Sequence, residues 1–100
     1  MKIKILPSAY KDIRNGYEFY EKQQDGIGRY FMDSIFSDID SLQIFAGVHA
    51  IYFEKFHRML SKRFPFAIYY QMKDNQIIVC AVLDCRRDPV KIGNRLNNYK

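Results

Sequence analysis

The chain has 100 residues, of which 48% are hydrophobic and 27% are charged, with a formal net charge of +5. This length predicts one domain over residues 1–100, and the apolar content argues against disorder. No apolar run reaches the roughly 18 residues of a membrane-spanning helix, and the apolar part of the first ten residues is too short for a signal peptide. We therefore expect a cytoplasmic protein.

The positive charge is concentrated in the second half of the chain. Residues 1–54 carry six Lys or Arg and eight Asp or Glu, whereas residues 55–100 carry ten Lys or Arg and three Asp. A basic half indicates a polyanionic partner, either nucleic acid or an acidic protein segment. The alternative is a soluble domain that merely has a high isoelectric point.

The first expected elements are a strand over residues 2–6, where Lys and Ile alternate, and a helix over residues 8–22. Pro7 ends the strand, and Ser8 is expected to cap the helix. Gly16 weakens this helix but allows a neighbouring helix to approach. The apolar stripe of the helix consists of Ala9, Ile13, Tyr17 and Tyr20.

A second helix is expected over residues 27–45, after a polar connector at residues 23–26. Two amphipathic helices with a short link predict an antiparallel αα-hairpin, and their apolar stripes are interpreted as core packing against a sheet. Residues 51–53 favour extended backbone. The stripe of the second helix consists of Ile27, Phe31, Ile35, Ile39, Leu42 and Phe45.

Three strands are expected next, over residues 57–63, 66–73 and 76–84, forming an antiparallel meander. Phe64-Pro65 separates the first two strands, because proline lacks the N–H that a ladder needs. Asp74-Asn75 separates the other two and predicts a type I′ hairpin, since both residue types tolerate positive φ. The last strand is apolar on both faces, so it is expected in the middle of the sheet. Strict alternation places four of its side chains on one face: Ile77, Val79, Ala81 and Leu83.

A short C-terminal helix is expected after the meander. Asp88 is the expected N-cap, Pro89 suits the first helical position, and Ile92, Leu96 and Tyr99 recur at helical spacing. The expected fold is therefore α+β, in the order β-α-α-β-β-β with a short C-terminal helix, and its meander sheet packs against an αα-hairpin.

Basic residues are expected to gather at one end of this sheet. The first and third strands of a meander run parallel to each other, so Lys62 and Arg63 lie at the same end as Arg86 and Arg87. Arg58 is four residues before Lys62, which places both on one face of the first meander strand. These five residues are the candidate target-binding residues, because clustered cations suit phosphate or carboxylate recognition.

Two further interpretations stay open for these residues. In the first, Arg63 and Arg87 pair with Asp88 or with helix acids such as Asp33, and only stabilise the fold. In the second, His57 acts as a general base, although a strand histidine without a catalytic role is the commoner case.

Metal and redox motifs are missing from the sequence. His49 and His57 are the only histidines, and Cys80 and Cys85 lack the C-x-x-C spacing of zinc and redox sites. In an extended strand, five residues separate the two cysteines by about 16 Å, too far for a disulfide. Two free thiols, no metal and no cofactor are expected.

Three segments resemble the RelE/ParE toxin superfamily, and most of all its ParE-like branch of plasmid stabilisation toxins. They are residues 57–70 (HRMLSKRFPFAIYY), 77–83 (IIVCAVL) and 86–89 (RRDP). The strand-helix-helix start is similar to the same family, so the resemblance covers the full length of the chain. It implies the toxin of a bacterial type II toxin–antitoxin system, whose partner is a small antitoxin.

The resemblance also implies two targets. ParE-like members block DNA gyrase, whereas RelE-like members cleave messenger RNA in the ribosome without a metal. The ribonuclease branch often has Arg on the middle meander strand and Tyr or His near the C-terminus, but here Ala67 and Gly93 stand near those positions. Arg87 does match the basic residue that follows the last strand. The comparison favours a gyrase inhibitor.

Two alternatives to gyrase inhibition are kept. One is a RelE-like, ribosome-dependent mRNA endonuclease with His57, Arg63 and Arg87 as catalytic candidates and Arg86 as a further basic group. The other is an inactive homologue that only binds its antitoxin.

Overall fold

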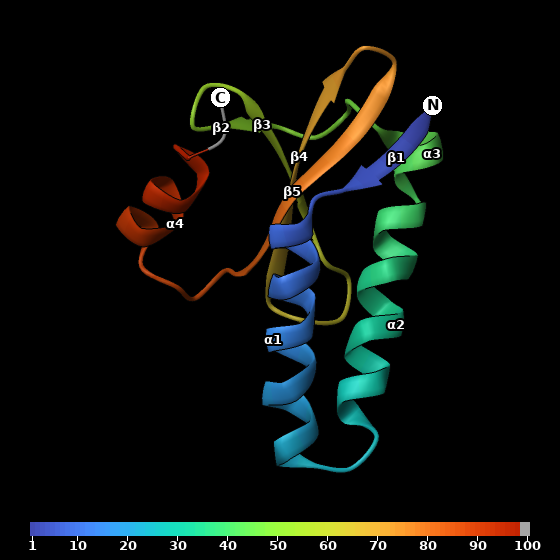
Figure 1. Ribbon diagram of the computed structural model, residues 1–100, viewed down its shortest axis with the longest axis vertical. Coiled ribbons are helices and arrows are strands. Elements are labelled where there is room, and N and C mark those ends of the chain that lie inside the picture. Colours follow the sequence, from blue (N-terminus) through green and yellow to red (C-terminus); the bar gives the residue numbers. More distant parts are fainter. Residues whose placement is uncertain (99–100) are drawn as a thin grey trace.

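The computed structural model describes residues 1–98, and across them the chain forms five strands and four helices (Figure 1). In chain order these are β1 (Lys2–Ile5), α1 (Pro7–Gln23), α2 (Ile27–Asp40), α3 (Leu42–Phe45), β2 (Ile51–Tyr52), β3 (Phe56–Leu60), β4 (Phe66–Lys73), β5 (Gln76–Asp84) and α4 (Pro89–Leu96). The expected α+β order, with a meander and a short C-terminal helix, is confirmed. Within residues 1–98, no helix is both long and apolar enough to cross a membrane.

One mixed sheet contains the strands in the order β1-β5-β4-β3-β2. The meander β3-β4-β5 is antiparallel, and β1 runs parallel to β5. The central strand is β4, so the expectation that residues 76–84 form the middle of the sheet is wrong: β1 adds one strand beyond β5, and β2 adds one beyond β3. Both faces of β5 are nevertheless covered, by α1 and by α4, which explains its apolar sequence.

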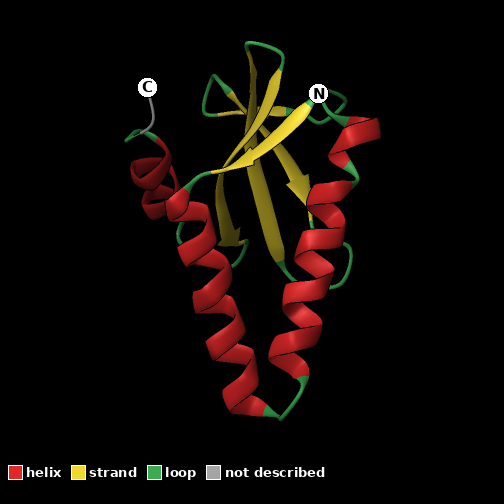
Figure 2. Cartoon of the chain, turned by 45° about the vertical axis from the view of Figure 1, so that its right-hand side comes forward, coloured by secondary structure: helices red, strands yellow, loops and turns green. Residues whose placement is uncertain are grey.

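The hairpin of α1 and α2 packs on one face of the sheet (Figure 2). α1 begins at Pro7 with Leu6 as its N-cap, so the expected cap by Ser8 is wrong. Proline suits the first turn, where its missing N–H would have no helical partner. The Ser8 hydroxyl donates instead to the carbonyl of Cys80 on β5, at 3.5 Å.

Glycines allow the close approach of the two helices. A Cβ on Gly16 of α1 would lie 2.5 Å from the ring of Phe31 on α2, and one on Gly28 would lie 2.6 Å from the carbonyl oxygen of Tyr17. Real Cβ atoms do not come that close to other atoms, so only glycine fits at these two positions. The expected role of Gly16 is thereby confirmed.

The second expected helix is interrupted. α2 ends at Asp40, and after Ser41 the chain continues as the single turn of α3. The Ser41 hydroxyl donates to the carbonyl of Asp38 at 2.6 Å, a local bond that competes with helix continuation. Phe45, expected on the buried stripe, is 51% exposed, whereas the middle of that stripe is fully buried: Phe31, Ile35, Ile39 and Leu42.

Two apolar cores lie on opposite faces of the sheet, one under the helical hairpin and one under α4. The register between β4 and β5 shifts at Tyr69/Tyr70, and this β-bulge leaves Cys80 as an extra residue on β5. The expected alternation therefore fails after Val79. Ala81 and Leu83 belong to the core under α4, and Ile77 and Val79 to the core under the hairpin.

The turns and the last helix follow the local signals in the sequence. Asp74 and Asn75 have φ of 52° and 60°, as a type I′ hairpin requires. The Asp88 carboxylate accepts from the Val90 N–H at 2.9 Å and caps α4, with Pro89 in the first turn. Ile92 and Leu96 are buried against the sheet, while Tyr99 lies outside the described residues.

Candidate functional site

Four basic side chains lie at one end of the sheet, and together they are called here the basic rim: Lys62, Arg63, Arg86 and Arg87. β3 ends at Leu60 rather than residue 63, so Lys62 and Arg63 belong to the turn before Pro65. The carbonyl of Pro65 accepts from the Cys85 N–H at 2.8 Å, which holds this turn beside the segment that follows β5. All four rim residues are exposed.

Aromatic side chains of the helical hairpin lie among the arginines of the rim. The Arg63 guanidinium lies over the Tyr30 ring, 5.9 Å from its centre. The ring of Phe64 packs against Tyr20 and Tyr30, with centroids 4.8 and 5.6 Å apart. Sequence reasoning missed this combination. A signal for it was present in Phe19 and Tyr30, which lie off the predicted apolar stripes and are about half exposed.

Arg86 is the rim residue that is engaged within the fold. Its guanidinium makes two hydrogen bonds to the Asp84 carboxylate, at 2.9 and 2.6 Å, and its backbone N–H donates a third at 2.8 Å. These bonds from Arg86 lower the pKa of Asp84. The Asp84 carboxylate therefore balances the charge of Arg86, and the main contribution of Arg86 is to fix the conformation of the rim.

Arg63 and Arg87 are differently placed. The pairing that would have made them purely structural does not occur, because Asp33 pairs with Arg29 at 3.5 Å and Asp88 caps α4. Neither Arg63 nor Arg87 forms a salt bridge with another residue in the described range 1–98. The Arg87 charge helps to lower the pKa of Asp84, but no described carboxylate holds Arg63 or Arg87 in a salt bridge, so both guanidinium groups can bind an external partner.

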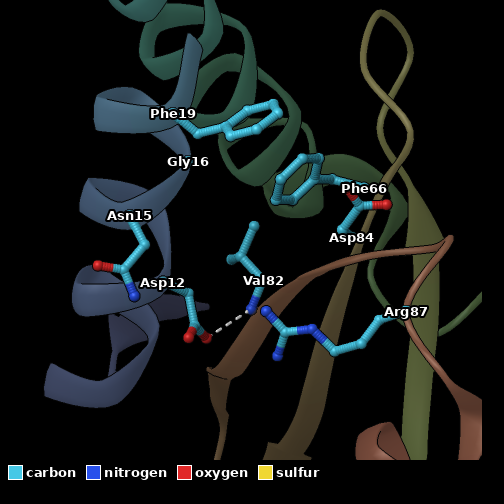
Figure 3. Close-up of a pocket in the computed structure, with 8 residues that line it drawn as sticks. All are labelled: Asp12, Asn15, Gly16, Phe19, Phe66, Val82, Asp84 and Arg87. Atoms are coloured by element: carbon cyan, nitrogen blue, oxygen red, sulfur yellow. Dashed lines mark hydrogen bonds between the residues drawn. The ribbon is translucent and has the colours of Figure 1, made fainter. Parts of the chain in front are cut away.

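A groove of about 210 Å³ lies between α1 and the end of β5, next to the rim. Figure 3 shows the side chain of Arg87 reaching along it toward α1, with Phe19 and Phe66 at its other end. The groove is thus partly aromatic and contains a cation, Arg87, that forms no salt bridge within the described part of the chain, which suits a segment that carries both apolar and acidic side chains. Its lining residues are Asp12, Asn15, Gly16, Phe19, Phe66, Val82, Asp84 and Arg87.

Arg58 does not join the rim. It is half-buried on the face of the sheet that α4 covers, where its guanidinium lies 4.9 Å from the centre of the Tyr52 ring and donates to Cys85 Sγ at 3.6 Å. The expectation that Arg58 and Lys62 share one strand face is wrong, because β3 ends before Lys62. The Lys62 backbone N–H donates to Asp38 on α2 at 3.3 Å, on the other side of the sheet.

His57 lies away from the other two catalytic candidates. It pairs with Tyr70 on β4, whereas the rim adjoins Phe66, four residues or about 13 Å along the same strand. The structure therefore does not unite His57, Arg63 and Arg87 in one site. His57 Nδ1 donates to the carbonyl of His49 at 2.8 Å, and its ring stacks on Tyr70.

The cysteines are both free, as expected. Cys80 is buried in the core under α4, and burial raises the pKa of its thiol to about 11, which keeps it protonated and unreactive. Within residues 1–98, no three His, Cys, Asp or Glu side chains are grouped so that they could hold a metal ion.

The geometry defines an α+β protein with a helical hairpin on a five-stranded mixed sheet and a basic, aromatic end. No protein-family model matches the sequence, and no curated protein matches it. Among solved structures, a chain of the chromosomal ParDE toxin–antitoxin system from P. aeruginosa superposes with a TM-score of 0.75 at 19% sequence identity. The match covers 82% of this chain and 92% of that one. The chain therefore has a ParE-like fold.

Proposed function

We propose that this chain is the toxin of a type II toxin–antitoxin system, that a cognate antitoxin neutralises it, and that its target is DNA gyrase. The proposal takes residues 1–100 as one domain that acts in the bacterial cytoplasm. Its main support is the combination of a ParE-like fold with a groove and a basic rim that adjoin each other. The fold alone would not suggest a function, because one fold hosts many activities.

The groove is the proposed site of the antitoxin. An antitoxin segment with an apolar residue against Phe19 and Phe66 and a carboxylate near Arg87 would complement it in shape and charge. Such a segment would also cover Arg87 and thereby remove one of the two unpaired arginines from the target. The contact that binds the antitoxin would therefore also cover part of the target-binding surface and neutralise the toxin.

The rim is the proposed target-binding surface. Gyrase is favoured over messenger RNA because a metal-independent ribonuclease needs a proton-transfer group within hydrogen-bond reach of the scissile phosphate. His57 on β3 pairs with Tyr70, which is about 13 Å along β4 from Phe66 beside the rim. Ala67 and Gly93 provide no proton-transfer group. A RelE-like mRNA endonuclease and an inactive homologue are the alternatives.

The test compares the two target classes directly. We expect the purified protein to inhibit DNA supercoiling by gyrase and to leave ribosome-bound mRNA intact. The variant Arg63→Ala with Arg87→Ala should raise the inhibitory concentration at least tenfold, because two unpaired cations are lost. The matched control Arg14→Ala with Lys91→Ala removes the same charge from exposed positions on α1 and α4 and should behave as the parent.

Other outcomes would reassign the protein. Cleavage of mRNA with normal supercoiling would replace gyrase by the RelE-like activity. Harmless expression and silence in both assays, with antitoxin binding retained, would indicate the inactive homologue. Failure to bind any antitoxin encoded beside the gene would remove the support for the toxin class.

A further inference from the structure

A second cationic cluster lies at the opposite end of β4 from the basic rim. There a shallow cavity of about 260 Å³ is lined by Lys55, His57, Gln71, Met72 and Lys73. The β3–β4 ladder ends at the pair His57–Tyr70, while β4 continues to Lys73, so the cavity lies beside the part of β4 that extends past β3. The nearest carboxylates in sequence, Glu54 and Asp74, do not line it. We call it the His57 pocket.

The imidazole of His57 is held in one orientation. Its Nδ1 lies 2.8 Å from the carbonyl oxygen of His49, and a carbonyl only accepts, so Nδ1 carries a proton. One face of the ring stacks on Tyr70, with centroids 5.0 Å apart and an angle of 19°. Nε2 is consequently the polar ring atom that remains for a ligand. It is an acceptor when the ring is neutral and a donor when the ring is charged.

The loop that binds the His57 ring is itself held by hydrogen bonds. His49 Nδ1 lies 2.5 Å from the Tyr70 hydroxyl, and that hydroxyl also accepts from the Gly47 N–H at 2.9 Å. The loop that supplies the His49 carbonyl is therefore tied to the same tyrosine on which His57 stacks. Such a supporting set is typical of a polar group that is positioned for a ligand.

The charges of the pocket indicate the class of ligand. Lys55 and Lys73 line the pocket and together match a group of charge −2, and Gln71 adds an amide donor. The Lys55 ammonium lies 5.8 Å from the centre of the Phe56 ring, a contact that leaves its N–H donors for a ligand. A phosphate monoester has a second pKa of about 6, so near neutral pH it exchanges between a monoanion with a P–OH and a dianion. The P–OH can donate to a neutral Nε2, and the dianion can accept from a protonated one. A diester has a single charge and no P–OH.

We propose that the His57 pocket binds a phosphate monoester or inorganic phosphate through Lys55, Lys73 and His57. The volume favours a compact group, since pockets for larger ligands start at about 300 Å³. This site is separate from the proposed gyrase-binding rim and does not depend on that proposal.

The test is an NMR titration of the full-length protein near neutral pH with three probes: inorganic phosphate, methyl phosphate and dimethyl phosphate. We expect saturable shifts of the His57 imidazole nitrogens with the first two, and at least tenfold weaker binding of dimethyl phosphate. Tighter binding of methyl phosphate than of inorganic phosphate would identify an esterified ligand, and equal binding would identify free phosphate. Equal binding of methyl and dimethyl phosphate, or no shift at His57, would overturn the proposal.

Variants distinguish a specific phosphate site from nonspecific electrostatic attraction between phosphate and a basic surface. Lys55→Met with Lys73→Met should weaken methyl phosphate binding at least tenfold, while Lys11→Met with Lys91→Met removes equal charge elsewhere and should leave it unchanged. The His57→Asn variant keeps a donor for the His49 carbonyl but lacks an equivalent of Nε2, so it should bind methyl phosphate more weakly. The His57→Gln variant should bind methyl phosphate more tightly than the His57→Asn variant. Equal losses in the two lysine pairs, or full binding by the His57→Asn variant, would overturn the assignment. Circular dichroism confirms that each variant is folded.

Discussion

At the residue scale, one buried carboxylate connects three elements of the fold. Asp12 on α1 accepts from the Val82 N–H of β5 at 3.0 Å and from both terminal nitrogens of Arg95 on α4, at 2.8 and 2.7 Å. The pairing of β1 with β5 stops at Val79, so the Val82 N–H finds its acceptor in this side chain. The local sequence around Asp12 does not indicate these contacts, because Val82 and Arg95 lie 70 and 83 residues away in the chain.

We expect Asp12→Ala to lower the free energy of unfolding by about 3 kcal/mol, because it removes the carboxylate that balances the largely buried Arg95 and that accepts from the Val82 N–H. Urea denaturation measures this. Asp33→Ala is the control, since it breaks an exposed pair with Arg29 and should cost less than about 1 kcal/mol. A similar small loss in both variants would show that Asp12 is dispensable.

A pH effect is expected from His49. Burial, and secondarily the charge of His57, lowers the pKa of His49 in the folded protein below that of an exposed histidine. The unfolded chain therefore binds more protons in the window below about pH 6.5, and stability falls as the pH drops through that window toward the folded pKa. His49→Gln should flatten the urea midpoint between pH 5 and 7. An unchanged slope would contradict this account.

At the element scale, the packing of α1 on α2 depends on the missing side chain of Gly16. Its neighbour Phe31 is fully buried and packs edge-on against Phe64 and Phe66, with centroids 5.1 and 4.9 Å apart. The ring therefore has no room to retreat. A helix interior normally favours alanine over glycine by about 1 kcal/mol, so this position opposes the local preference.

We expect Gly16→Ala to destabilise the protein by about 1–3 kcal/mol, as overpacking does in other cores. Gly93→Ala on α4 is the matched comparison. Its Cβ would meet the Phe53 ring at 3.2 Å, and that ring is 39% exposed and can move, so the change should be within about 0.5 kcal/mol. Thermal unfolding of both variants tests the contrast, and a stabilised Gly16→Ala protein would refute it.

The elements also show which sequence signals were sufficient. The Asp74-Asn75 hairpin and the Asp88-Pro89 helix start depend on backbone preferences of the residues themselves, and both were predicted. The end of α2 at Asp40 and the bulge at Cys80 were not predicted. The end of α2 involves a hydrogen bond of the Ser41 hydroxyl to the Asp38 carbonyl that the apolar stripe does not reveal, and the bulge depends on how β5 pairs with β4.

At the scale of the whole molecule, the two ends of β4 are chemically distinct. One end has the basic rim and the groove, and the other has the His57 pocket. They lie at opposite ends of β4, and no described side chain lines both the groove and the pocket. They can therefore be altered independently.

We expect the Arg63→Ala, Arg87→Ala variant to lose growth inhibition in cells while it keeps methyl phosphate binding, since the changed residues do not line the His57 pocket. The Lys55→Met, Lys73→Met variant should show the reverse pattern. Growth assays and NMR titration on the same two proteins give the comparison. Loss of both properties in either variant would mean that the two ends are coupled.

The sequence by itself determined the order of elements, the meander, the helical hairpin and the position of Lys62 and Arg63 at the same end as Arg86 and Arg87. These features follow from periodicity, turn chemistry and strand direction, which depend on residues close together in the chain. The roles of these residues in binding stay predictions.

Only the tertiary structure decided which arginines are unpaired and what surrounds them. The β-bulge, the Tyr30 ring under Arg63 and the separation of Arg58 and His57 from the rim all depend on contacts between distant segments. The sequence shows how many basic residues there are and where they stand in the chain. Packing decides which of them already have a partner and which face of the sheet each occupies.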